Sequence, residues 1–94
     1  MTIMMKYEPI YTNKFKKNFQ LMKKRGMDLL LLETVMGKLI AGEKLDEKYC
    51  DHALIGNFAG KRDCHVKPDW VLIYSYSDEY IIFESTGTHA DLFD

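Results

Sequence analysis

Residues 60–85 read GKRDCHVKPDWVLIYSYSDEYIIFES, and this stretch decides the class of fold. It contains three short runs that are rich in β-branched and aromatic residues, GKRDCHV (60–66), WVLIYSY (70–76) and YIIFES (80–85). Residues of these types favour β-strands. The last two runs are separated by Ser-Asp-Glu (77–79), a composition typical of a tight turn. We therefore predict three consecutive strands, the last two joined as a hairpin.

The first half of the chain shows helical periodicity instead. A first helix is predicted between Thr12, a suitable N-cap, and Gly26, a suitable C-terminal cap. A second helix is predicted between Asp28 and Gly42, which can serve the same two roles. Both helices carry apolar residues at helical spacing. These residues are Phe15, Phe19 and Met22 in the first helix and Leu29, Leu32, Val35, Met36, Leu39 and Ile40 in the second.

The remaining segments complete a predicted order of β-α-α-β-β-β. A mixed run at 4–11 predicts an edge strand that stops near Pro9, and the polar run EKLDEKYCDH (43–52) predicts a loop. This order indicates an α+β domain in which two N-terminal helices pack on a mainly antiparallel sheet. No repeat or Pro/Gly-rich linker divides the 94 residues, so we expect one domain spanning 1–94.

Composition narrows the class of protein. Hydrophobic residues make up 47% of the chain and aromatic residues 13%, which favours a folded globule over a disordered segment. No apolar run approaches the roughly 20 residues needed to span a bilayer, and the N-terminus lacks the pattern of a secretory signal peptide. The two cysteines, Cys50 and Cys64, are therefore expected to be free thiols. These features predict a cytoplasmic protein with no membrane segment.

Charge is distributed unevenly along the chain. Residues 1–42 carry eight Lys/Arg against three Asp/Glu, a net charge of +5, whereas residues 43–94 carry five against eleven, a net charge of −6. A basic first half provides a surface for phosphates or for an acidic partner. A solvated helix face explains the same lysines equally well. The overall charge of −1 is also less basic than is usual for nucleic-acid binders.

All three histidines, His52, His65 and His89, lie in the second half of the chain. Histidine can accept or donate a proton near neutral pH because its unperturbed pKa is about 6.5. Cleavage of RNA through the ribose 2′-OH needs a base for that hydroxyl proton and an acid for the departing 5′ oxygen. The residue types therefore fit metal-free cleavage of RNA, although a single histidine is more often an ordinary structural residue.

A zinc site is the alternative for the same region. Cys50, His52, Cys64 and His65 are ligand types that zinc favours. Cys64 and His65 are neighbours, however, and on a strand they face opposite sides of the sheet. Cys50 and His52 are also closer than the usual spacer of about two to four residues. The spacing disfavours a metal site, and we expect none.

The order of residues is more specific than their types. DHALIGNFAGKRDCHVKPDWVLIY (51–74) and FESTGTHADLF (83–93) resemble the signature of YafQ-type toxins of the RelE superfamily. That signature reads roughly D-H-x-L-x-G-x-x-x-G-x-R-D-x-H-x-x-P-D-W-x-L-I-Y and then R-T-G-T/S-H-x-x-L-F. The resemblance implies a RelE-like microbial ribonuclease fold and cleavage of mRNA codons on the ribosome. It also implies no cofactor and a DinJ-type antitoxin as partner, in a heterotetramer that contacts operator DNA only through the antitoxin.

The resemblance also implies an acid–base set by position. His52, His65, Asp69 and His89 would form this set, with His89 as the leading candidate for the proton donor. The motif leaves open which histidine is the general base. Asp69 is the residue of the set that can orient a histidine through a hydrogen bond.

Four further positions would hold the substrate in the same comparison. Trp70 and Phe93 would shape the site and position the nucleotide. Lys61 lies four residues before His65 and should share its face of a regular strand. Arg62 belongs to the motif but lies three residues before His65, so on a regular strand it should face the other way.

One position departs from the family pattern. In the family, the residue before T-G-T/S-H is usually an arginine, which looks like the cation that stabilises the transition state. In this chain the residue is Ser85. Regular alternation predicts that Ser85 shares a face with Ile81 and Phe83, at the rim of the site. Two classes of function stay open. The chain is a competent mRNA endonuclease in which Lys61 supplies part of the missing charge, or it is an attenuated or inactivated toxin that binds antitoxin and ribosome but cleaves little.

Overall fold

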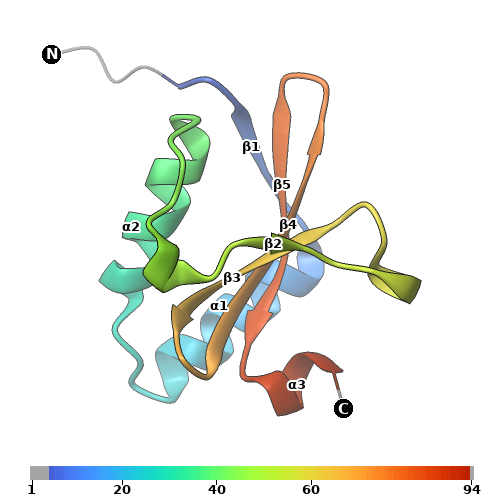
Figure 1. Cartoon of the computed structure of the whole chain (residues 1–94). Coiled ribbons are helices and arrows are strands. Elements are labelled where there is room, and N and C mark those ends of the chain that lie inside the picture. The colour runs from blue at the N-terminus through green and yellow to red at the C-terminus, as the bar shows by residue number, and fades with distance from the viewer. Residues whose placement is uncertain (1–4, 94) are drawn as a thin grey trace, which may run out of the picture.

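A five-stranded sheet with the strand order β1-β5-β4-β3-β2 organises the molecule (Figure 1). Figure 1 is a computed structural model, and the structure describes residues 5–93. β1 runs parallel to β5, and every other pair is antiparallel. The mainly antiparallel sheet is therefore confirmed. The strands are β1 (Glu8–Tyr11), β2 (His52–Ala53), β3 (Arg62–Lys67), β4 (Trp70–Ser77) and β5 (Tyr80–Gly87).

The two predicted helices form between the predicted caps. In α1 (Asn13–Lys24) the Thr12 hydroxyl accepts the Phe15 N–H at 2.9 Å, and in α2 (Leu29–Ile40) the Asp28 carboxylate accepts the Leu30 N–H at 3.1 Å. Gly26 and Gly42 follow the helices with φ of +76° and +78°. This left-handed backbone conformation favours glycine at the end of a helix. The helices therefore begin and end where local capping chemistry places them.

One face of the sheet packs against α1 and α2 and forms the main core. The sheet contributes Cys64, Trp70, Leu72, Tyr74, Ile81 and Phe83 to this core, and the helices contribute Phe15, Met22, Leu32, Val35, Met36 and Leu39. The opposite face carries a smaller cluster of Val71, Ile73 and Leu92, with Leu54 packed against it. We call these the helix face and the histidine face of the sheet. The main hydrophobic core thus lies on the helix face, and the histidine face carries the smaller cluster.

Three details of the predicted order need correction. The first strand does not stop near Pro9 but runs through it, from Glu8 to Tyr11, and position 4 lies outside the described residues. The Glu8 N–H donates to Glu79, just before β5, at 2.8 Å, and the Thr12 N–H donates to Phe83 of β5 at 3.2 Å, so by alternation the nitrogen of Pro9 faces the free edge. A proline is tolerated there because no partner strand needs its missing N–H.

The other two corrections concern short elements. The predicted loop at 43–52 contains a 3₁₀ turn, η1 (Glu47–Tyr49), and its last residue begins β2. A second 3₁₀ turn, η2 (Gly56–Phe58), precedes β3. A terminal helix, α3 (His89–Phe93), follows β5 (Figure 1). Within residues 5–93, no helix is long and apolar enough to cross a membrane.

Candidate active site

The three histidine rings lie in a row on the histidine face of the sheet. The ring centroids of His52 and His65 are 6.5 Å apart, and those of His65 and His89 are 5.3 Å apart. β2 places His52 beside β3, and the first turn of α3 brings His89 to the other side of His65. The side chains of His52 and His89 are 54% and 48% exposed, so a substrate can reach both ends of the row.

Asp69 holds His89 at one end of this row. Its Oδ1 atom lies 2.7 Å from His89 Nδ1 and accepts the backbone N–H of His89 at 3.1 Å. The hydrogen bond from the His89 side chain is the main reason why the pKa of Asp69 lies below its ordinary value. The carboxylate therefore stays ionised and holds a proton on Nδ1, which leaves Nε2 of His89 outside this hydrogen bond.

A buried carboxylate that sequence reasoning missed lies under the row. Asp63 is 4% exposed, and its Oδ1 atom lies 3.1 Å from His52 Nδ1. That nitrogen points to the carbonyl oxygen of Cys50 at 2.7 Å, and Asp63 Oδ1 has no hydrogen-bond partner in the described residues. Burial raises the pKa of Asp63, while positive charge on the three histidines would lower it. A signal was present in the sequence, because Asp63 lies two residues before His65 and shares its face.

A β-bulge in β5 decides where Ser85 points. Tyr74 of β4 pairs with Phe83, but the next residue, Ile73, pairs with Ser85. Glu84 is therefore the extra residue of the bulge. Paired residues on antiparallel strands share a face, so Ser85 lies with Ile73 on the histidine face. The prediction that Ser85 shares a face with Ile81 and Phe83 is wrong, because the bulge interrupts the alternation on which it depended.

The bulge aligns Ser85 with Asp63 across the sheet. Ile73 of β4 pairs with Asp63 on one side and with Ser85 on the other. Ser85 is 4% exposed. The position that carries arginine in the family signature thus lies two strands away from the buried carboxylate of Asp63, whose Oδ1 has no hydrogen-bond partner in the described residues.

The predicted substrate-positioning residues divide between the two faces. Phe93 belongs to the histidine row, with its ring centroid 6.0 Å from that of His89 and 39% of its surface exposed. Lys61 is on the same side, but its Nζ atom lies 3.9 Å from Glu84 Oε1. Trp70 is 1% exposed in the core of the helix face, where its Nε1–H donates to Thr86 Oγ1 at 3.0 Å. It cannot stack on a base in this conformation.

Arg62 is held away from the histidines, as alternation predicts. Its Nε atom donates to Asp51 Oδ1 at 3.3 Å, and the hydroxyl of Tyr74 donates to the same oxygen. Arg62 pairs with Tyr74 in the sheet, so it belongs to the helix face. It therefore anchors Asp51, the residue before His52.

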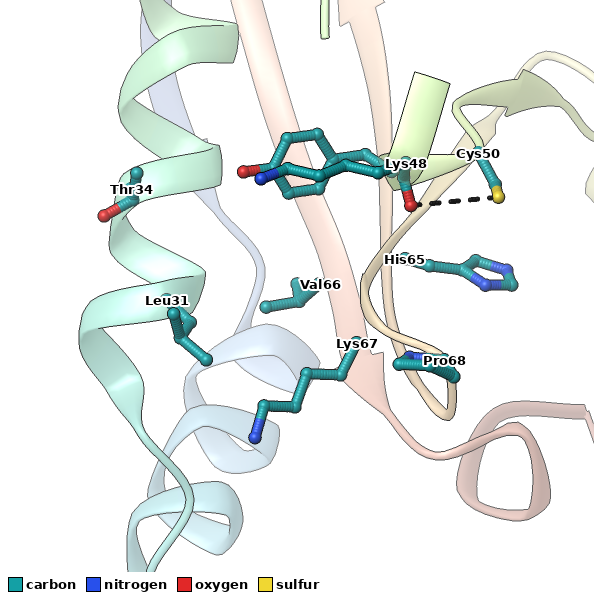
Figure 2. A pocket seen from close by; sticks show the side chains of 9 residues that line it. Leu31, Thr34, Lys48, Cys50, His65, Val66, Lys67 and Pro68 are labelled. Atoms are coloured by element: carbon teal, nitrogen blue, oxygen red, sulfur yellow. Dashed lines mark hydrogen bonds between the residues drawn. The ribbon is translucent and has the colours of Figure 1, made fainter. Parts of the chain in front are cut away.

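The cavity beside β3 is lined in part by His65, the central histidine of the row, and by Cys50. It has a volume of about 510 Å³ and lies between α2 and β3. Figure 2 shows Val66 and Lys67 directed toward α2, while the ring of His65 points to the other side of β3. Cys64 is buried on the helix face, and burial raises the pKa of its thiol. Cys64 and His65 thus cannot join in one zinc site, and within residues 5–93 no group of three or more Cys, His, Asp or Glu is placed to hold a metal ion.

α3 is tied to the rest of the fold by an ion pair. The guanidinium of Arg25, at the end of α1, donates to the two carboxylate oxygens of Asp91 at 2.7 and 3.2 Å. Asp91 also accepts the Thr88 N–H at 2.9 Å, and the Thr88 hydroxyl accepts the Asp91 N–H at 3.1 Å. A side chain at Gly87 would meet Asp91 at 2.9 Å. The glycine before α3 is therefore needed for the approach that puts His89 over the sheet.

We expect Arg25→Gln to loosen α3 without unfolding the protein. Its guanidinium contacts only Asp91 among the hydrogen bonds and ion pairs of the described residues, and it is exposed, so the effect should be about twofold to fivefold. The measurement is hydrogen exchange of the Leu92 amide, which bonds to Thr88 at 3.1 Å. Lys24→Gln, with the same loss of charge one residue earlier, is the control. Equal exchange in both variants would show that the ion pair does not hold α3.

Comparison with known proteins identifies relatives of this chain. Residues 7–94 match the family model described as bacterial toxin of type II toxin-antitoxin system, YafQ. The mRNA interferase toxin YafQ of Escherichia coli K12 is 44% identical over 84 residues, which are 88% of this chain and 91% of the relative. A further curated relative, the putative toxin YafQ of Haemophilus influenzae, is 37% identical over 74% of each chain.

Solved structures agree with the fold over almost the whole chain. The crystal structure of the E. coli DinJ–YafQ toxin–antitoxin complex contains a chain with 41% identity and a TM-score of 0.88, covering 95% of this chain and 99% of that one. A metal-bound toxin from Helicobacter pylori has 35% identity and a TM-score of 0.87, covering 93% and 99%. The two helices on a mainly antiparallel five-stranded sheet are thus a shared architecture.

Proposed function

Because the chain belongs to the YafQ family of toxins from bacterial type II toxin–antitoxin systems, we propose that it is an mRNA endoribonuclease that cleaves codons on the ribosome and so inhibits translation. The observation that carries this proposal is the row of three histidines with the Asp69–His89 pair at one end. The name of the E. coli relative, an mRNA interferase toxin, supports the same activity.

The proposed reaction is acid–base cleavage within the RNA strand. His52 or His65 accepts the proton of a ribose 2′-OH, whose oxygen attacks the adjacent phosphorus. His89 donates a proton from Nε2 to the departing 5′ oxygen, while Asp69 stabilises the charged imidazolium that supplies it. The strand is thus divided into a 2′,3′-cyclic phosphate and a 5′-OH. No step needs a metal, although a related toxin from H. pylori was solved in a metal-bound form.

The other predicted residues support this reaction in different ways. Phe93 contacts the nucleotide directly, because its ring is exposed beside His89. Lys61 adds positive charge on the histidine face. Trp70 and Arg62 act from the helix face, Trp70 by fixing Thr86 in β5 and Arg62 by fixing Asp51 before His52.

A binding module with little activity is the second candidate function. The observation that favours it is Ser85, which leaves the position of the family arginine without a cation, while Lys61 is engaged with Glu84. Growth arrest on induction, with and without an antitoxin, separates the two candidates. A competent endonuclease arrests growth unless the antitoxin is present, and a binding module does not.

The chemistry of the cut ends tests the proposed mechanism. Cleavage of a programmed ribosome should leave a 2′,3′-cyclic phosphate or a 3′-phosphate together with a 5′-OH. It should also survive EDTA at a magnesium concentration that keeps control ribosomes intact. A product with a 5′-phosphate would instead indicate metal-assisted hydrolysis and overturn the acid–base proposal.

A DinJ-type antitoxin is the proposed partner, as in the E. coli complexes. Its C-terminal segment would fold over the basic first helices and cover the histidine row, in a heterotetramer. The net charge of +5 in residues 1–42 supports an acidic segment as the occupant of that surface.

Association with this antitoxin should be fast at low salt and slow down as ionic strength rises, because exposed charges steer the encounter. Removing two exposed charges of α1 in Lys16→Gln/Lys17→Gln should lower the association rate. Lys44→Gln, outside the basic half, should change it less. The measurement is stopped-flow binding across a salt series. If the DinJ-like protein forms no complex at any salt concentration, the partner assignment is wrong.

A further inference from the structure

The loop between β2 and β3 presents an aromatic residue that the family signature does not include. η2 carries Phe58 between Gly56 and Gly60, which have φ of +67° and +90°. The loop is closed by its own backbone, since the Leu54 N–H donates to Lys61 at 2.9 Å and the Lys61 N–H donates to Phe58 at 3.0 Å. Phe58 is therefore held in a defined place by the loop.

Phe58 extends the histidine row at the end where His89 lies. Its ring centroid is 5.4 Å from that of Phe93, with the two planes at 71°, and Phe93 is 6.0 Å from His89. Five rings thus follow one another from Phe58 through Phe93, His89 and His65 to His52, each within 6.5 Å of the next.

The two phenylalanines are not part of the hydrophobic core. Neither belongs to the core of the helix face or to the smaller cluster on the histidine face. Phe93 is 39% exposed, Phe58 is partly exposed, and Ile55, three residues before Phe58, is 87% exposed. Residues 55–59 carry no charged side chain, so the loop offers a ring and apolar surface in place of charge. An unpaired nucleobase fits such a surface better than a phosphate does.

We propose that Phe58 and Phe93 form a stacking platform for one unpaired base of the mRNA, next to the phosphate at which His89 acts. This inference rests on the proposed function and adds a substrate contact to it. Because the two ring planes are strongly tilted, a base that stacks on one ring meets the edge of the other. Stacking of this kind accepts every base, so the platform contributes affinity and position more than sequence choice.

A non-cleavable RNA tests the platform without requiring catalysis. The probe is a short single-stranded adenine-rich oligonucleotide with a 2′-O-methyl group at the scissile position, titrated against the full chain by NMR. Phe58→Ala should weaken its binding by about tenfold, and Phe58→Trp should preserve it. Phe58→Leu keeps apolar bulk without a ring and should weaken binding like alanine while the fold is retained. Leu30→Ala, at a 68% exposed position on α2, is the matched control and should bind like the parent.

Cleavage provides a second readout in chains that are active. Loss of a contact made equally in ground and transition states should raise KM for Phe58→Ala and leave kcat nearly unchanged. If no variant cleaves RNA but binding still depends on Phe58, the endonuclease proposal fails and the platform stands. Equal oligonucleotide binding by the parent, Phe58→Ala and Phe58→Leu would overturn the platform, as would the absence of any binding by the parent. A loss of antitoxin binding alone in Phe58→Ala would instead make this surface a protein contact and also overturn it.

Discussion

Replacing His89 with alanine is expected to slow cleavage of a defined codon on a programmed ribosome by about 10²–10⁴-fold, the usual contribution of a positioned acid or base. The reason is geometric. Asp69 Oδ1 is 2.7 Å from His89 Nδ1, so Nε2 is the nitrogen that can donate to the departing 5′ oxygen. Alanine also favours the helix, so α3 should persist and the loss should be chemical.

Two controls separate the proton donor from its support. Asp69→Asn keeps the size of the side chain but removes the charge that stabilises the imidazolium, so it should lower the rate less than His89→Ala and shift the alkaline limb of the pH–rate profile to lower pH. Ala90→Ser, one residue along α3, should leave the rate near that of the parent. A His89→Ala variant that cleaves as fast as the parent would exclude His89 as the proton donor.

Ser85→Arg is expected to raise cleavage and toxicity by at least about tenfold, because one well-placed donor to transition-state charge is typically worth about 10²–10³ in rate. The bulge at Glu84 makes this expectation stronger than regular alternation would, since it directs position 85 to the histidine face. An arginine offers a charged fork that matches phosphate oxygens, whereas serine offers one neutral donor. Antitoxin affinity should change much less.

The variants of position 85 should be measured together with Lys61. Ser85→Gln has a long side chain with a neutral donor and is the control for size. If Lys61 supplies part of the missing charge, Lys61→Ala should slow the parent more than it slows Ser85→Arg. The double variant completes the cycle. Equal rates for the parent and Ser85→Arg would show that this position does not hold the transition-state cation, and would favour the binding module.

The pH dependence of unfolding, to which Asp63 contributes, tests Ser85→Arg without any RNA. Burial raises the pKa of Asp63, so the neutral form is favoured in the fold and the stability that Asp63 contributes is lost as pH rises above the ordinary value of 3.8. An arginine at position 85, across Ile73 from Asp63, would favour the carboxylate and lower that pKa. The pH dependence of unfolding should therefore be weaker in Ser85→Arg than in the parent, and weaker also in Asp63→Asn.

The elements that sequence predicts well are those with local signals. Thr12 and Asp28 cap the two helices, and alternation together with a turn at 77–79 defines the hairpin of β4 and β5. β2 and α3 have only two and five residues, which is too short for a periodic pattern, and both form through contacts with distant segments. The family signature supplied the histidines and Asp69, but their spacing in the sequence could not show that the rings form a row.

Three features of the site depend on cross-strand pairing, so the sequence alone could not predict them. The position of Ser85 depends on the register between β4 and β5. The burial of Asp63 depends on the cover that β2 and His52 provide. Trp70 was predicted in the site, but the hydrogen bond to Thr86 holds it in the core of the helix face. Each of these outcomes is decided by a partner far away in the sequence.

The extra residue in β5 also affects how this strand tolerates insertions and deletions. Before Glu84 the odd-numbered residues Ile81 and Phe83 face the helices, and after it the even-numbered Thr86 does. Deleting Glu84 would remove the bulge and restore one continuous alternation, with Ser85 and Thr86 kept on their present faces, and it would also remove the carbonyl oxygen that accepts the Thr12 hydroxyl at 2.7 Å. A one-residue change in the turn at 77–79 would instead disturb the hydrogen bond that the Glu79 carbonyl accepts from the Glu8 N–H at 2.8 Å. We therefore expect the bulge at Glu84 to be a place where relatives can lose one residue from β5 while the residues on both sides of it keep their faces.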